Sequence, residues 1–245
     1  MAKTIIITGA GSGIGAVTAT HFLEAGWNVA LLGRREEPLQ KIAANHPQAL
    51  VLPCDVVDES AVDAAFDKVV TRFGHLDTLF NNAGIGVFGA PIDELSVADW
   101  RACIDINLNG SFICARAAFG VMRGQTPMGG RIINNGSISA YAPRPGSAPY
   151  TASKFAITGL TKTIALDGRP YDITCGQIDI GNAGTEMTMG MAKGIIQADG
   201  SIRGEPTMDV ANVANAVLQM AELPLEVNVL NMTLMASKMP FVGRG

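Results

Sequence analysis

Short apolar runs rich in β-branched residues alternate along the chain with longer stretches in which apolar residues recur at helical spacing. The first run, 4–8, contains three consecutive isoleucines and is apolar on both faces, which is typical of a buried strand in a parallel sheet. This alternation predicts βαβ units and therefore an α/β fold. The expected strands are 4–8, 28–32, 49–52, 78–81, 131–135, 173–178 and 227–230. The expected helices are 14–24, 36–45, 60–73, 100–122, 147–166 and 210–221.

One long segment, 184–207, is rich in Gly and Met and has weak periodicity. Because a loop of this length inside a compact domain is usually functional, we interpret it as a substrate lid. The alternative is a variable surface insertion. The 245 residues are expected to form one domain, 1–245.

Composition narrows the class of protein. The chain is 48% hydrophobic and 16% charged, so a large core is available. Its net charge of -4 argues against a nucleic-acid-binding surface. No apolar stretch is long enough for a membrane span, and the run 5–7 is too short for a signal peptide, so a cytoplasmic protein is expected. The four cysteines form no CxxC and have no His at ligand spacing, so we expect buried thiols and no metal site.

A glycine-rich turn separates the first strand from the first helix. Gly9, Gly11, Gly13 and Gly15 stand where a helix N-terminus presents free backbone N–H groups, and 11–16 fits the loose dinucleotide fingerprint. Glycine lets the backbone approach a pyrophosphate closely. The turn therefore predicts a dinucleotide site, with a plain connector as the alternative.

The residues at the end of the second expected strand indicate which dinucleotide is bound. An NAD enzyme usually has an acid there, to hold the ribose 2′-OH. Here Gly33 is followed by Arg34 and Arg35, and a guanidinium suits a 2′-phosphate. NADP(H) is therefore favoured over NAD(H). The alternative is that these arginines form a solvated face paired with Glu36 and Glu37.

Tyr150 and Lys154 are four residues apart, so a helix would place both side chains on one face. A neighbouring ammonium lowers the pKa of a phenol, which could then exchange a proton with a carbonyl or alcohol oxygen. Ser137, at the end of the fifth expected strand, is a candidate donor to the same oxygen, although such serines are often turn formers.

Together these features resemble the short-chain dehydrogenase/reductase family, in its small single-domain form. The resemblance covers nearly the whole chain and is carried by the glycine turn 8–15, Asp55-Val56, 81–84, Asn107, Ser137, Tyr150 and Lys154.

The resemblance implies a doubly wound, Rossmann-like sheet of seven parallel strands with helices on both faces. It implies that Tyr150 is the acid/base and that Lys154 lowers its pKa and holds the nicotinamide ribose. Ser137 would position the substrate oxygen, and Asn107 would support a water-linked proton relay through Lys154. Thr185 would contact the carboxamide. The implied cofactor-binding residues are Gly9, Ser12, Gly13, Ile14, Gly15, Arg34, Arg35, Asp55, Val56, Asn82, Ala83, Gly84, Tyr150, Lys154 and Thr185.

The chain departs from the family pattern in places. Ile180-Gly181 replaces the usual Pro-Gly, which weakens the assignment of Thr185, and Ser139 could compete with Ser137 for the substrate oxygen. An apolar substrate pocket could be lined by Phe88, Tyr141, Met187 and Met189.

The family also implies a homotetramer, or at least a homodimer, through the helices at 100–122 and 147–166.

Taken together, these expectations predict that the protein is an NADP(H)-dependent oxidoreductase acting on a small carbonyl or alcohol substrate. A non-catalytic NADP(H)-binding redox sensor or scaffold is the alternative. The complete set of Asn107, Ser137, Tyr150 and Lys154 favours the enzyme, because a pure binder needs only the ribose contacts. A nucleotide-sugar epimerase or dehydratase is less compatible with 245 residues.

Overall fold

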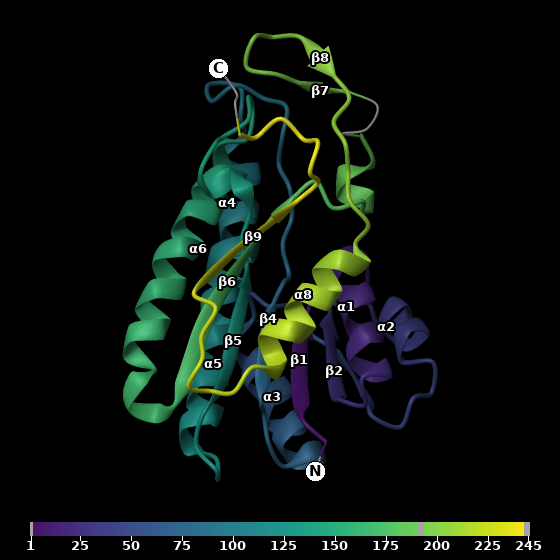
Figure 1. Ribbon diagram of the computed structural model, residues 1–245, viewed down its shortest axis with the longest axis vertical. Coiled ribbons are helices and arrows are strands. Elements are labelled where there is room, and N and C mark those ends of the chain that lie inside the picture. Colours follow the sequence, from purple (N-terminus) through teal and green to yellow (C-terminus); the bar gives the residue numbers. More distant parts are fainter. Residues whose placement is uncertain (1, 191–193, 243–245) are drawn as a thin grey trace.

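Seven parallel strands form one sheet in the order β3-β2-β1-β4-β5-β6-β9. The computed structural model describes residues 2–190 and 194–242 (Figure 1). The strands of this sheet are β1 (Thr4–Thr8), β2 (Asn28–Gly33), β3 (Ala49–Pro53), β4 (Thr78–Asn81), β5 (Gly130–Asn135), β6 (Ile173–Gly181) and β9 (Asn231–Met235). The α-helices are α1 (Gly13–Glu24), α2 (Glu36–Ala43), α3 (Glu59–Phe73), α4 (Val97–Ile104), α5 (Gly110–Gly124), α6 (Ala148–Asp167) and α8 (Ala211–Glu222). The doubly wound α/β fold expected from the sequence is confirmed.

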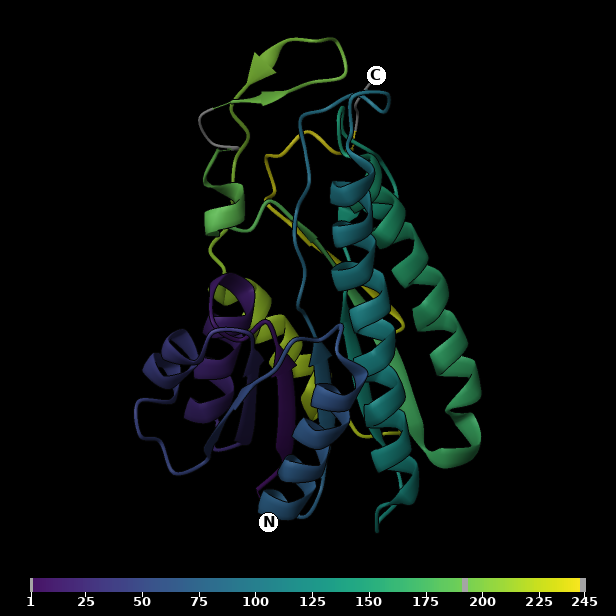
Figure 2. The ribbon, with the colours of Figure 1, turned by 180° about the vertical axis from the view of Figure 1, so that it is seen from behind.

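Helices cover both faces of the sheet. In β1, Ile5 and Ile7 belong to the core under α1, α2 and α8, whereas Ile6 belongs to the core under α3, α5 and α6. Figure 1 shows the first set of helices, and Figure 2 shows the second set from behind. A strand with side chains buried on both faces has to be apolar throughout, which is why the run of isoleucines predicted it.

The helix expected at 100–122 is longer and interrupted. It begins at Val97 because the Ser96 hydroxyl caps it by accepting a hydrogen bond from the Asp99 N–H at 3.0 Å. A π-helical turn at Asp105–Asn109 then joins α4 to α5. Such turns are frequent at functional sites.

The last strand of the sheet lies further along the chain than expected. Its pairing with β6 runs from Asn231 to Met235, so the strand predicted at 227–230 is wrong. Val227 and Leu230 are exposed, and the segment before β9 is held by Arg131, whose guanidinium donates to three carbonyl oxygens of that segment at 3.0–3.1 Å. The apolar pattern here marks a tethered loop rather than a strand.

The expected lid contains regular structure. It holds a 3-10 turn at Glu186–Thr188 and an antiparallel hairpin of β7 (Ile195–Ile196) and β8 (Ile202–Arg203). Residues 191–193 of this segment lie outside the described residues. In the described parts of the chain, no helix is long and apolar enough to cross a membrane.

Candidate active site

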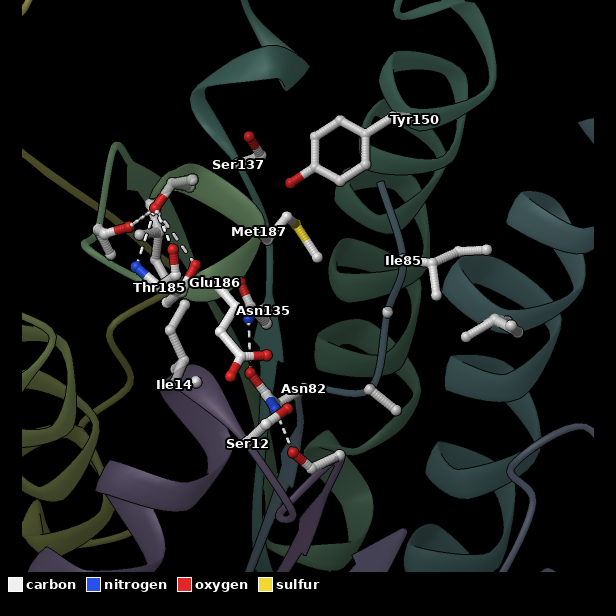
Figure 3. A pocket seen from close by; sticks show the side chains of 18 of the residues that line it. Ser12, Ile14, Asn82, Ile85, Asn135, Ser137, Tyr150, Thr185, Glu186 and Met187 are labelled. Atoms are coloured by element: carbon white, nitrogen blue, oxygen red, sulfur yellow. Dashed lines mark hydrogen bonds between the residues drawn. The ribbon is translucent and has the colours of Figure 1, made fainter. Parts of the chain in front are cut away.

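A cavity of about 440 Å³ opens at the carboxyl ends of the strands, where open α/β sheets bind their ligands. Figure 3 shows Ser12 and Asn82 at one end and Ser137 and Tyr150 at the other. All the cofactor-binding residues expected from the sequence line its wall, except Gly15.

The glycine turn has a shape that only glycine allows. Gly9 and Gly13 have φ angles of +65° and +53°, in the left-handed region. A Cβ on Gly9 would lie 2.9 Å from the Ala83 Cα. Gly15 lies behind the turn instead of in the wall, and its Cβ would be 2.3 Å from the Gly9 carbonyl oxygen. The role of Gly15 is therefore to let α1 pack closely against the turn.

The segment after β4 is bonded to this turn. The Thr8 hydroxyl accepts hydrogen bonds from the backbone N–H groups of Asn82 and Ala83 at 2.8 and 2.9 Å. The Asn82 amide donates to the Thr8 carbonyl and accepts from the Asn135 side chain at 2.8 Å. Three neighbouring strand ends are thus joined into one rigid floor.

At the opposite end from Tyr150, Arg34 and Arg35 are exposed members of the wall. Glu37 forms an ion pair with Lys41, and the Glu36 carboxylate accepts a hydrogen bond from Gln40. Within residues 2–190 and 194–242, neither Arg34 nor Arg35 forms an ion pair. The alternative pairing with the two glutamates is therefore not observed.

This wall fits a dinucleotide. The left-handed glycines leave room for a pyrophosphate beside a helix N-terminus, where N–H groups point outward. Asp55 stands in the wall after β3, and its carboxylate accepts from the Val57 N–H at 3.3 Å, which fixes its orientation.

Tyr150 and Lys154 lie on α6, as their spacing predicted. The Lys154 ammonium donates to the Asn135 carbonyl at 2.7 Å and stands 5.5 Å from the centre of the Tyr150 ring. Burial lowers the pKa of Lys154 to about 8, although the negative charge of Asp179 opposes this.

The net pKa of Tyr150 is raised in this structure, so the lowering expected from Lys154 stays a prediction. Burial raises the pKa of the phenol, the Ser137 hydroxyl lowers it, and Cys103 and Asp179 raise it further. Desolvation of the phenolate is the largest of these contributions.

Ser137 is held in place by a buried acid that sequence analysis missed. Asp179, with no exposed surface, accepts from the Ser137 backbone N–H at 2.9 Å and from Gln177 at 2.6 Å. Its second oxygen accepts from the Tyr141 hydroxyl at 2.7 Å and from Asn231 at 2.6 Å. An acid near the end of a buried strand was the available signal.

Ser139 also lines the cavity, and its backbone N–H donates to the Ser137 hydroxyl at 3.1 Å. Both hydroxyls therefore remain candidates for the substrate oxygen. Because the Ser137 hydroxyl also interacts with Tyr150, Ser137 is the better placed of the two.

Asn107 is buried in the π-helical turn and is not part of the cavity wall. Its side chain accepts from the Ile85 N–H at 2.8 Å and donates to the Ile85 carbonyl at 2.9 Å and to Ser153 at 3.2 Å. Asn107 thus ties the segment that follows 81–84 to α6.

Two of the four residues expected around an apolar substrate pocket line this cavity. Phe88 and Met187 line the cavity, and the Phe88 ring lies 5.1 Å from that of Tyr150. Tyr141 and Met189 are not part of its wall, because the Tyr141 hydroxyl is bonded to Asp179 and Met189 is exposed.

The lid contributes further wall residues. Thr185 lines the cavity with its methyl group against the glycine turn, where a Cβ on Gly13 would lie 3.5 Å away. Glu186 projects between the two ends of the cavity (Figure 3). The sequence did not identify Glu186, Arg144 or Asn182 as wall residues.

Known proteins agree with this architecture. A family model described as short chain dehydrogenase matches residues 3–195. The sulfoacetaldehyde reductase 2 of Chromohalobacter salexigens is 32% identical over 242 residues, which cover 97% of this chain and 96% of that protein.

Two solved structures share the fold. A 3-ketoacyl-(acyl-carrier-protein) reductase from Brucella melitensis, complexed with NADH, has a TM-score of 0.85 at 24% identity, covering 96% of this chain and 98% of that one. An alcohol dehydrogenase from the archaeon Thermococcus sibiricus, complexed with 5-hydroxy-NADP, has a TM-score of 0.81 at 26% identity, covering 96% of each chain. With the family model matched over most of its length, the chain belongs to the short-chain dehydrogenase/reductase family of nicotinamide-dependent oxidoreductases.

Proposed function

We propose that this protein transfers a hydride between NADP(H) and a carbonyl or alcohol substrate, with Tyr150 as the acid/base. The observation that carries the proposal is the convergence of Ser137, Tyr150 and Lys154 on the cavity whose far end holds the glycine turn. When bound, the nicotinamide supplies or accepts the hydride, and the residues of this chain handle the proton.

The Tyr150 hydroxyl donates its proton to the substrate oxygen during reduction and takes it back during oxidation. Ser137 orients that oxygen through a second hydrogen bond. Lys154, at the Asn135 carbonyl and over the Tyr150 ring, favours the phenolate when the proton leaves. Asn107 bonds the Ile85 segment to α6, the helix that carries Tyr150 and Lys154, and so helps to hold these two residues in position.

NADP(H) is the proposed cofactor because Arg34 and Arg35 stand in the wall after β2 without an ion pair to any described residue, and a guanidinium binds phosphate oxygens with charge-assisted bonds. NAD(H) is the alternative. Asp55 and Val56 would hold the adenine, Asn82 to Gly84 would line the cleft, and Thr185 would meet the carboxamide.

We also propose that the active protein is a homotetramer or homodimer. Large apolar side chains are exposed on the outer surfaces of α4, α5 and α6, including Trp100, Phe112, Phe155 and Leu166. A second copy would remove them from water. Light scattering coupled to size-exclusion chromatography measures the state directly.

The test of the function is a fluorescence titration with NADPH and NADH, followed by rates with a panel of aldehydes and ketones. Wild-type protein is expected to bind NADPH more tightly and to reduce part of the panel. Tyr150→Phe should lower kcat by about 100- to 10,000-fold while NADPH affinity stays the same. Binding without turnover in the wild type would favour the non-catalytic alternative, and near-normal rates in Tyr150→Phe would contradict the mechanism.

A further inference from the structure

One residue of the cavity wall, Arg144, forms a buried ion pair with Glu205 of the lid segment. Arg144 belongs to the loop between Ser139 and α6, and its guanidinium donates to both carboxylate oxygens of Glu205 at 2.7 and 2.6 Å. The two side chains are only 8% and 1% exposed. This is a bidentate pair in the geometry that binds carboxylates most strongly.

Glu205 also accepts hydrogen bonds from two other segments of the chain. It accepts from the Asn182 side chain at 2.8 Å and from Gln197, in the β7–β8 hairpin, at 3.0 Å. Asn182 in turn accepts from Arg144 at 3.3 Å. The carboxylate therefore fastens the hairpin of the lid to the end of β6 and to the loop that carries Arg144.

The Arg144–Glu205 pair determines which positively charged side chains are available to bind an anionic substrate. Apart from Arg34 and Arg35 after β2, the cations that line the described part of the wall are Lys154 and Arg144. In the proposed function Lys154 acts on Tyr150, which leaves Arg144 as the wall cation that could be dedicated to a carboxylate or sulfonate. Glu205 already fills that position.

We propose that Glu205, by occupying the guanidinium of Arg144, makes the substrate end of the cavity selective for uncharged carbonyl and alcohol compounds over carboxylates and sulfonates. This inference rests on the proposed function. An incoming anion would have to displace Glu205, leaving a buried carboxylate without its partner, or lie unpaired against apolar wall residues. A neutral substrate meets neither cost, and Phe88, Met187 and Ile138 offer it apolar contact.

The selectivity is distinct from the sulfoacetaldehyde activity named for the relative described above, whose substrate is an anion. The chain thus carries a cation, Arg144, in the cavity wall, and the carboxylate of Glu205 in the lid segment neutralises it. Removal of the carboxylate should expose that cation to the substrate.

The test uses matched pairs of an acid and its methyl ester: 4-formylbenzoate with methyl 4-formylbenzoate, and levulinate with methyl levulinate. Reduction of each is measured as kcat/KM with the preferred nucleotide, and binding is measured by calorimetry. In the wild type the esters should exceed the acids by about tenfold or more. Acids that react or bind as well as their esters would overturn the inference while leaving the proposed function intact.

Glu205→Gln keeps a side chain of the same size and removes the charge. It should lower the ester-to-acid ratio by about tenfold or more, because Arg144 becomes available to the acid. The double variant Arg144→Gln/Glu205→Gln is the matched control, since it lacks both charges and should not gain acid activity. An unchanged ratio in Glu205→Gln, or the same gain in the double variant, would remove Glu205 from specificity.

The wild-type comparison does not depend on how the variants fold. If no probe is reduced but the esters still bind more tightly than the acids, the proposed function fails and the selectivity of the site stands.

Discussion

The buried carboxylate of Asp179 accepts a hydrogen bond of 2.9 Å from the backbone N–H of Ser137, although 42 residues separate them. Four donors from three parts of the chain converge on this carboxylate. An anion so fully bonded is rigid, and it fixes where the Ser137 hydroxyl stands relative to Tyr150. Its charge also reaches the two titrating groups of the site.

Asp179→Asn should shift the pH–rate profile of alcohol oxidation to lower pH. Burial, Cys103 and Asp179 raise the pKa of Tyr150, and Asp179 also raises that of Lys154, so loss of its charge lowers both values. The displacement is measured as the change in the midpoint of kcat/KM between pH 5 and 11. An asparagine oxygen can still accept from Ser137, so KM should change little. A lower kcat with an unmoved profile would assign Asp179 a structural role alone.

Arg34→Ala should weaken NADPH binding by about 10- to 100-fold, because the 2′-phosphate loses charge-assisted bonds. NADH binding should change little, since NADH lacks that phosphate. Fluorescence titration measures both. Arg169→Ala, which removes an exposed guanidinium outside the cavity wall, is the control for net charge. Equal losses for both nucleotides would exclude Arg34 from 2′-phosphate recognition.

Gly136→Ala should destabilise the protein by roughly 1–3 kcal/mol, because the added methyl overpacks the Asp179 site. A Cβ there would lie 2.0 Å from an Asp179 carboxylate oxygen and 2.7 Å from the Gln177 amide nitrogen. Thermal and urea unfolding give the change. Gly124→Ala, at the end of α5 with no atom within 4 Å of its Cβ position, should change stability by less than about 1 kcal/mol. Similar effects at both positions would contradict the tight packing around Asp179.

Acid should loosen the lid through Glu205. Burial raises the pKa of this carboxyl, but hydrogen bonds from Arg144, Asn182 and Gln197 outweigh it and lower the pKa from 4.5 to about 2. A group whose folded pKa is lowered contributes stability above its unfolded value and loses it as pH falls toward the folded value. The loss between pH 6 and pH 3 should reach roughly 2 kcal/mol.

The measurement is urea unfolding at pH 6 and at pH 3 for the wild type and Glu205→Gln. Other carboxyls titrate equally in both proteins, so the difference between their pH dependences isolates Glu205. Parallel pH dependences would mean that the pair contributes nothing to stability.

Much of the fold could be predicted because buried parallel strands and their covering helices have local signals. The isoleucines of β1 need apolar neighbours on both faces, and the left-handed turn at Gly9 and Gly13 requires glycine whatever the rest of the chain does. Tyr150 and Lys154 share a helix face through their spacing alone.

Tertiary structure decided what depends on contacts between distant parts of the chain. The Asp179–Ser137 bond and the Arg144–Glu205 pair join residues 42 and 61 positions apart, and no local pattern encodes such partners. The strand β9 starts at Asn231 because its register is set by β6 and by the loop that Arg131 tethers. The pKa of Tyr150 is raised by burial, and burial is a property of the folded chain. Sequence thus determined which residues were present for the chemistry, and packing determined their neighbours, their hydrogen-bond partners and the direction in which their pKa values shift.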